Sequence, residues 1–205
     1  MTPSVTDDRK QLRKQLRSKR RALTPSQQQK AAQRLVKHLR AHPVFLRSQH
    51  IALYMADDGE IDLQPLLRVA QRMGKQCYLP VLHPLKRNTL WFGRYRCGDV
   101  LLANRFGLAE PMNKKILPAW ALDLVLMPLV GFDQQGNRLG MGGGFYDRTF
   151  SFKQKTKNGE SSNRPKCPAL MGVAHSCQEL PSLAGEAWDV QLDCIVTDQK
   201  IITVK

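Results

Sequence analysis

The first 47 residues carry apolar and charged positions with the period of an α-helix. Leu12, Leu16 and Leu23 fall near one side of a helix that starts around Asp7, and arginines recur on the adjacent stripe. These arginines are Arg13, Arg17 and Arg20. The pattern predicts an amphipathic first helix with a cationic flank.

A second helix is predicted to start at Thr24. A proline follows Thr24 directly and Gln27 stands three residues after it, which is the arrangement of a capping box. Its apolar face consists of Ala31, Leu35 and Leu39. The pair His42-Pro43 is expected to end the helix, because a residue that precedes proline avoids the helical region.

From about residue 48 short apolar runs alternate with helical patterns, which favours a parallel sheet covered on both faces. Strands are predicted at 51–55, 77–81, 90–95, 124–127, 169–174 and 194–197, with a possible edge strand at 201–204. Helices are predicted at 62–73 and from 145 to 152, while 99–120 reads mostly as connection and 153–166 as a polar, mobile stretch. We therefore predict one domain over 1–205 with a three-layer α/β/α fold and a mostly parallel sheet, on which the basic helices of 7–41 pack.

Positive charge is concentrated at the N-terminal end. The chain has a formal net charge of +15, of which residues 1–47 contribute +11 from 13 Lys or Arg against Asp7 and Asp8. Such a region attracts nucleic acid, a membrane surface or a multiply charged small molecule, and it can equally be a solvated helix face.

Several classes of protein are disfavoured by composition. With 42% hydrophobic residues the chain can form a sizeable core, and no run approaches the roughly 18 apolar residues that cross a bilayer. The N-terminus lacks the apolar core of a secretory signal, so a cytoplasmic protein is expected. The five cysteines form no C-x-x-C pair and are interpreted as reduced thiols.

A glycine-rich loop follows the predicted strand at 124–127. It contains Gly140, Gly142, Gly143 and Gly144, flanked by Arg138 and by Tyr146-Asp147-Arg148. Glycines at this density let backbone N–H groups converge on a polyphosphate, although a flexible surface turn would look similar. The loop matches neither the Walker A pattern nor G-x-G-x-x-G. The neighbouring arginine and the Tyr-Asp pair at a helix start favour phosphate binding.

Other polar residues follow predicted strands, where ligands bind in an open α/β sheet. They are Asp58-Gly59-Glu60, His175 and Thr197-Asp198. We interpret His175 as a hydrogen-bonded residue at a strand end and leave it out of the site.

The segments Gly131-Phe132-Asp133, 136–140 and 142–148 closely resemble the signature of 5-formyltetrahydrofolate cyclo-ligases, also called 5,10-methenyltetrahydrofolate synthetases. Weaker matches extend along the chain, including Arg21–Pro25, Ile51–Tyr54, Glu110-Pro111 and Trp188-Asp189. Two positions depart from the usual signature, because Met141 and Phe145 stand where tyrosines are common.

The resemblance implies a Rossmann-like fold related to sugar-phosphate isomerases and CoA transferases. It also implies an enzyme that uses ATP and Mg²⁺ to convert 5-formyltetrahydrofolate, with or without a polyglutamate tail, into 5,10-methenyltetrahydrofolate, ADP and phosphate. The formyl oxygen is phosphorylated and N10 then closes the ring, so no covalent nucleophile is required. We expect a monomer that binds neither nucleic acid nor membranes.

Site residues are carried over from the same resemblance. The catalytic set is Arg138, Tyr146 and Asp147. The ATP set is Arg9, Lys10, Arg13, Arg138, Leu139, Gly140, Met141, Gly142, Gly143, Gly144, Phe145 and Tyr146. The folate set is Met55, Glu60, Met141, Gly142, Gly143, Gly144 and Phe145, and the Mg²⁺ carboxylates are Asp147 and Asp193. For both carboxylates a structural role is the alternative: Asp147 can stabilise a helix dipole and Asp193 can simply precede a strand.

Two rival functions remain open from the sequence. The basic helices could bind nucleic acid, which predicts steeply salt-dependent binding that survives loss of the glycine loop. The fold could instead belong to a sugar-phosphate isomerase or CoA-transferase relative, which needs no ATP.

Overall fold

The computed structural model describes residues 5–112, 115–157 and 167–204. Its largest sheet has eight strands, β1 (His50–Ala52), β2 (Gln76–Leu82), β3 (Leu90–Arg94), β6 (Ile116–Leu117), β7 (Leu124–Pro128), β10 (Ala169–Val173), β11 (Cys194–Val196) and β12 (Ile201–Thr203). Two small hairpins pair β4 (Leu101–Ala103) with β5 (Ala109–Pro111) and β8 (Gly131–Phe132) with β9 (Arg138–Leu139). The helices are α1 (Val5–Arg21), α2 (Pro25–Arg40), α3 (Pro43–Arg47), α4 (Gln64–Arg72), α5 (Phe145–Phe150) and α6 (Phe152–Lys157), with 3-10 turns η1 (Ala119–Ala121) and η2 (Ser176–Gln178).

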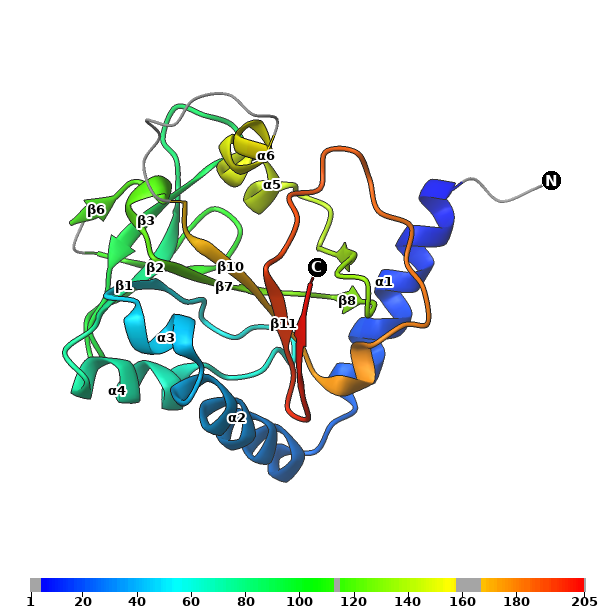
Figure 1. The fold of residues 1–205 in the computed structure, drawn as a ribbon, viewed down its shortest axis with the longest axis horizontal. Helices are drawn as coiled ribbons and strands as arrows, with labels where there is room; N and C mark the ends of the chain where they lie inside the picture. The colour runs from blue at the N-terminus through cyan, green and yellow to red at the C-terminus, as the bar shows by residue number, and fades with distance from the viewer. Residues whose placement is uncertain (1–4, 113–114, 158–166, 205) are drawn as a thin grey trace.

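The strand order is β12-β11-β10-β7-β1-β2-β3-β6 (Figure 1). The five strands from β11 to β2 are parallel to one another, whereas β12, β3 and β6 pair antiparallel at the two sides. The predicted mostly parallel sheet is therefore confirmed, and the predicted edge strand at 201–204 forms as β12. The carboxyl ends of β1, β7, β10 and β11 consequently meet at one edge of the sheet.

Helices cover both faces of the sheet, which produces the three predicted layers (Figure 1). Along β7, Leu124 and Leu126 join the core beneath α2, α3 and α4, whereas Val125 and Met127 join the core beneath α5 and α6. Because both faces of this strand are buried, its sequence is a continuous apolar run and does not alternate.

The two basic helices form where the sequence predicted them. The Thr24 hydroxyl accepts a hydrogen bond from the Gln27 N–H, and the Gln27 side chain accepts one from Thr24 N–H, so the capping box at α2 is confirmed. Helix α1 lies across the end of the sheet toward which β7 points (Figure 1). Its Leu16 is 1% exposed and packs with Val130 and Leu139 of the segments that lead to the glycine loop.

Three local expectations differ from the structure. Helix α2 ends at Arg40, before the His42-Pro43 pair as predicted, but Pro43 also begins α3, with His42 as its N-cap, since a proline fits the first turn of a helix. The predicted connection at 99–120 contains the β4–β5 hairpin, which turns at Gly107 with φ of 76°, followed by β6 and η1. Helix α6 occupies the start of the stretch at 153–166 that was predicted to be mobile, and 158–166 lie outside the described residues.

In the described parts of the chain, none of the helices combines the length and the apolar character that a membrane span requires. The single-domain organisation over 1–205 stays a prediction.

Candidate active site

Polar groups from distant segments meet where the parallel strands end. After β10, the His175 Nε2 donates to the Gly59 carbonyl at 3.1 Å, and the Ser176 N–H donates to Asp198 Oδ1 at 2.7 Å. His175 is 2% exposed and its backbone N–H also donates to Gln178, so its interpretation as a hydrogen-bonded structural residue is confirmed. Burial lowers the pKa of this imidazole. The predicted clustering at the carboxyl edge is therefore present.

The glycine loop turns its carbonyl oxygens toward the protein. The Gly140 carbonyl accepts from Arg13 Nε at 2.9 Å, and the Gly143 carbonyl accepts from Arg148 Nη1 at 2.7 Å and Asn88 Nδ2 at 3.0 Å. Among the described residues, no hydrogen bond uses an amide N–H of 140–144. A loop with occupied carbonyls and unused amides is suited to bind an anion.

Glycine is required in this loop for backbone reasons. Gly142 and Gly144 have φ angles of 94° and 63°, a region that residues with a side chain rarely adopt. A side chain at Gly144 would also collide with the Arg148 guanidinium. Gly144 stands at the N-cap of α5, so the loop passes directly into the first turn of that helix.

Arg138 and Asp147 form a partly buried ion pair below the loop. Arg138 is 7% exposed, and its Nη2 donates to Asp147 Oδ1 while its Nη1 donates to the Val190 carbonyl. The Val190 N–H donates to the same Asp147 oxygen at 3.1 Å. The sequence predicted that Arg138 would fork onto phosphate oxygens, whereas the structure shows its fork holding Asp147 and the 190 segment.

The aromatic side chains of α5 line the transition from loop to helix. Tyr146 is half-buried and stacks on Phe150 with ring centroids 6.4 Å apart, and burial together with the charge of Glu60 raises the pKa of its phenol. Phe145 meets the ring of Phe106, from the β4–β5 hairpin, edge to face at 5.9 Å. Met141 is exposed at the loop. Tyr146 therefore lies within electrostatic reach of Glu60.

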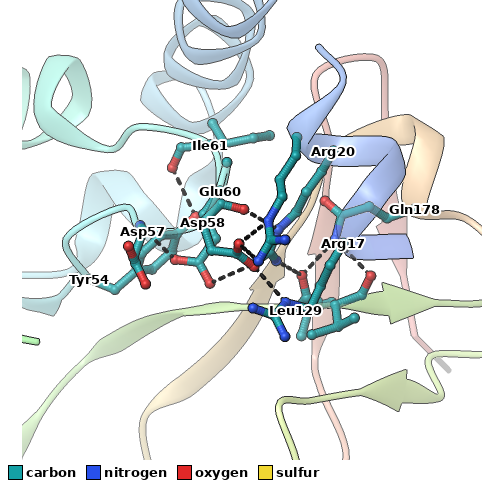
Figure 2. A network of polar contacts seen from close by, with 12 residues as sticks. Arg17, Arg20, Tyr54, Asp57, Asp58, Glu60, Ile61, Leu129 and Gln178 are labelled. Atoms are coloured by element: carbon teal, nitrogen blue, oxygen red, sulfur yellow. Dashed lines mark hydrogen bonds and ion pairs between the residues drawn. The ribbon is translucent and has the colours of Figure 1, made fainter. Parts of the chain in front are cut away.

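Glu60 belongs to a network that ties the loop after β1 to helix α1 (Figure 2). The backbone of Asp58 is in the left-handed conformation. Its carboxylate accepts hydrogen bonds from Arg17 at 2.6 Å, from Arg20 at 2.8 Å and from Arg21. Burial by itself would raise the pKa of Asp58, but these three donors outweigh burial and lower the pKa to about 2. Burial raises the pKa of Glu60 to about 7, against the opposing charge of Arg20.

The lowered pKa of Asp58 predicts an acid-dependent loss of stability. Because the folded pKa is about 2 and the usual value 3.8, the ionised carboxylate contributes about 2 kcal/mol that is present above pH 4 and is lost as the pH falls toward 2. In Asp58→Asn this contribution should be absent. Urea unfolding of both proteins between pH 6 and 2.5 measures it, and parallel pH profiles for the two proteins would contradict the assignment.

The N-terminal basic residues point in different directions. Arg13 contacts the glycine loop, and burial followed by the charge of Arg9 lowers its pKa. Arg9 forms an ion pair with Glu186 at 2.9 Å and donates to the Ala184 carbonyl at 3.3 Å, while Lys10 is exposed. The basic first helix is therefore only in part a solvated face. Lys10 is exposed, but five arginines bind groups of the protein itself: Arg9, Arg13, Arg17, Arg20 and Arg21.

The two carboxylates expected to bind Mg²⁺ lie in different surroundings. Asp147 is in the first turn of α5, and the hydrogen bonds from Arg138 and Val190 both end on its Oδ1. Asp193 precedes β11 at the opposite edge of the sheet, where its Oδ2 accepts from Lys153 and from Leu170 N–H at 2.7 Å. No group of three or more His, Cys, Asp or Glu within 5–112, 115–157 and 167–204 is arranged to hold a metal. The assignment of both carboxylates to Mg²⁺ stays a prediction.

The remaining expected contact, Met55, is half-buried and packs against the core beneath α2 and α4. Sequence reasoning did not select Asn88 and Arg148, which hold the Gly143 carbonyl, or Arg20 and Asp58, which hold the loop before Glu60. For Asp58 and Arg20 a signal existed: Asp58 lies in the polar run after β1, and Arg20 continues the stripe of Arg13 and Arg17. Asn88 gives no sequence signal, because a lone Asn in a loop is common.

Comparisons with known proteins point to one family. A sequence model described as the 5-formyltetrahydrofolate cyclo-ligase family matches residues 5–198. The 5-formyltetrahydrofolate cyclo-ligase of Escherichia coli K12 is 40% identical over 188 residues, 91% of this chain and 98% of that protein. The Haemophilus influenzae protein of the same name is 40% identical over 189 residues, 91% of this chain and 96% of its own.

Solved structures show the same relationship. The NMR structure of the Aquifex aeolicus 5,10-methenyltetrahydrofolate synthetase superposes with a TM-score of 0.79 at 28% identity, covering 96% of this chain and 93% of that one. The Mycoplasma pneumoniae 5,10-methenyltetrahydrofolate synthetase superposes with a TM-score of 0.69 at 25% identity, covering 93% and 99%. With its glycine loop, its basic first helix and this similarity over almost its whole length, the chain belongs to the 5-formyltetrahydrofolate cyclo-ligase family of enzymes.

Proposed function

We propose that this protein converts 5-formyltetrahydrofolate into 5,10-methenyltetrahydrofolate, with cleavage of ATP to ADP and phosphate and with Mg²⁺ as the metal. The observation that carries the proposal is the loop at 140–144, in which Arg13 binds the Gly140 carbonyl, Asn88 and Arg148 bind the Gly143 carbonyl, and the amides are unused among the described residues. Such a loop at a helix N-terminus binds the phosphate chain of a nucleotide.

The reaction balances without a covalent enzyme intermediate. The formyl oxygen attacks the γ-phosphorus of ATP, and the bond to the bridging oxygen breaks so that ADP leaves. N10 of the folate then attacks the formyl carbon and loses its proton, and the C–O bond breaks to release phosphate. Phosphoryl transfer of this kind depends on positioning and on neutralisation of charge, which this site can supply.

Each part of the site has a role in this scheme. The loop amides and Arg13 hold the triphosphate, and Arg9 and Lys10 add positive charge at the same end of α1. Glu60 accepts hydrogen bonds from the pterin ring, and Met55 and Phe145 are expected to contact the folate. Arg138 acts through Asp147, because its fork fixes that carboxylate against the 190 segment.

The donor set is compatible with Mg²⁺. This cation prefers oxygen ligands and is often held by one or two carboxylates together with substrate phosphates. Asp147, whose Oδ2 accepts no hydrogen bond from the described residues, fits one such ligand. When bound, Mg²⁺ would neutralise charge on the phosphates. Asp193, whose Oδ2 accepts from Lys153 and from Leu170 N–H, stays a second predicted ligand.

The test is a direct assay with purified protein. Incubation with 5-formyltetrahydrofolate, Mg²⁺ and ATP should raise the absorbance of the methenyl product, with one ADP released per product. Omission of ATP, or addition of a chelator, should abolish the signal. Product formed equally without ATP would refute the nucleotide-dependent step, and no product at all would overturn the proposal.

A further inference from the structure

Arg20 is an arginine buried within the molecule, with 0% of its surface exposed. Its Nε donates to the Asp58 carbonyl at 2.8 Å, its Nη2 donates to Asp58 Oδ2 at 2.8 Å, and its Nη1 donates to the Leu129 carbonyl at 3.4 Å. The same Nη2 lies 3.6 Å from Glu60 Oε1 (Figure 2). One guanidinium thus joins the loop after β1, the loop after β7 and the carboxylate of Glu60.

Two neighbouring arginines provide an internal comparison. Arg17 and Arg21 bind the same Asp58 carboxylate, but their side chains are 34% and 53% exposed. Burying a charged group is costly unless it is paired and hydrogen-bonded, so a fully buried Arg20 is an expensive way to hold Asp58 when exposed arginines already do so. Arg20 differs from them in two respects: it also binds the carbonyls of Asp58 and Leu129, and it is the arginine of the three that forms an ion pair with Glu60.

Glu60 is itself 12% exposed and is held from two sides. Its Oε2 accepts from the Asp57 N–H at 3.2 Å, and its Oε1 faces Arg20. The charged and titratable groups around it are Arg17 and Arg20 of α1, Asp57 and Asp58 of its own loop, Tyr54 after β1 and Tyr146 of α5. Burial favours its neutral form and the Arg20 charge opposes that preference.

We propose that Arg20 is a positioning residue of the formyl-folate site, which fixes the place of the Glu60 carboxylate and supplies its counter-charge. The inference rests on the proposed function, in which Glu60 accepts N–H groups of the pterin. An acceptor for two ring N–H groups must be both ionised and held in place. The charge of Arg20, 3.6 Å from Oε1, favours the ionised form, and the fork that binds Asp58 fixes that charge beside Glu60. The pterin is therefore recognised through helix α1 as well as through the loop that carries Glu60.

Three variants test the assignment. Arg20→Lys keeps the charge but cannot reach Asp58, Leu129 and Glu60 together, so KM for 5-formyltetrahydrofolate should rise roughly tenfold while KM for ATP changes less than about twofold. Arg20→Gln removes the charge, so the acidic limb of the kcat/KM profile for the folate should move to higher pH by roughly one unit. Arg21→Gln, which removes another donor to Asp58, should leave both KM values and the pH profile unchanged.

A double variant separates positioning from a merely structural role. In a Glu60→Gln background, Arg20→Lys should cause no further rise in KM for the folate, because the group it acts through is already changed. Circular dichroism and thermal unfolding show whether each variant folds. If Arg20→Gln does not fold, the KM values of Arg20→Lys alone test the role of Arg20.

The outcomes are distinct. An inactive wild-type protein would defeat the proposed function itself. An active wild type together with an Arg20→Lys variant whose folate KM is unchanged, or whose rises in KM for ATP and folate are equal, would overturn the role of Arg20. That role would also be overturned if Arg21→Gln matched Arg20→Lys, or if the effects of Arg20→Lys and Glu60→Gln were additive.

Discussion

Asp147→Asn should lower kcat by roughly 10²–10³-fold, the loss typical of removing one preorganised group that stabilises charge in a transition state. The amide keeps the size of the side chain and an oxygen that can accept from Val190 N–H, which in the wild type lies 3.1 Å from Oδ1. It removes the negative charge that pairs with Arg138 and that fits a Mg²⁺ ligand. Titration of Mg²⁺ at saturating ATP should show a higher apparent KM for the metal.

Stability must be measured alongside activity, because the variant leaves the buried Arg138 guanidinium without its carboxylate. We expect a loss of about 1–3 kcal/mol in the free energy of unfolding, which leaves the fold intact. Asp189→Asn is the matched control: it removes a charge one residue before Val190, and its carboxylate accepts from the Glu186 N–H. Near wild-type turnover in Asp147→Asn, or equal losses in the two variants, would refute the role of Asp147.

Glu60→Gln should have opposite effects on stability and on folate binding. Because burial raises the folded pKa of Glu60 to about 7 from an ordinary 4.5, its ionised form is held at a cost of about 3 kcal/mol above pH 7. Below pH 4.5 the Glu60 carboxyl is protonated and does not destabilise the folded protein. This advantage is lost as the pH rises through 7 and the carboxyl ionises. The variant should therefore unfold at higher urea concentration than the wild type at pH 8, and at a similar concentration at pH 4.

The same substitution should weaken the folate site. Replacing the carboxylate by an amide loses one charged acceptor for the pterin N–H groups, so KM for 5-formyltetrahydrofolate should rise by roughly 10–100-fold. Asp62→Asn is the control, since Asp62 is exposed two residues away and its Oδ1 accepts from Gln64 N–H at 2.9 Å. A Glu60→Gln protein with no gain in stability at pH 8 would contradict the raised pKa, and one with unchanged KM would remove Glu60 from the site.

Together these two predictions describe a site whose charged groups reduce the stability of the folded protein when no ligand is bound. A carboxylate kept in a buried place beside an arginine is costly to the folded protein, and in the proposed function this carboxylate accepts the N–H groups of the pterin. The glycine loop shows the complementary case, because its amides, unused among the described residues, can receive an anion. The two halves of the proposed reaction thus have different electrostatic requirements and are joined by α1 through Arg13 and Arg20.

The elements were predictable wherever the signal was local. The capping box at Thr24, the apolar run of β7 and the glycines after β9 are each read from a few consecutive residues. Strand ends were less certain, and β1 stops at Ala52 rather than at 55 because the chain then leaves the sheet to form the loop of Asp58 and Glu60. The β4–β5 hairpin was missed since its strands have three residues each and little alternation.

The partners of charged side chains could not be predicted. Arg138 meets Val190 across 52 positions and Arg20 meets Asp58 across 38, and a sequence does not show which donor will reach which acceptor. For the same reason, the sequence does not show that Arg138 pairs with Asp147 or that Asp193 pairs with Lys153. Phosphate binding by Arg138 and a shared Mg²⁺ at Asp147 and Asp193 stay predictions.

The sequence by itself determined the family, the layered α/β architecture and the glycine loop after β9, because periodicity, turn chemistry and a dense run of glycines act over short stretches of chain. Only the tertiary structure decided which charges are buried. It also decided that the pKa of Glu60 is raised, that the pKa of Asp58 is lowered, and which arginines pair with each carboxylate. Burial and ion pairing depend on residues that the sheet brings together from far apart, and the free energy of a charge is set by those surroundings.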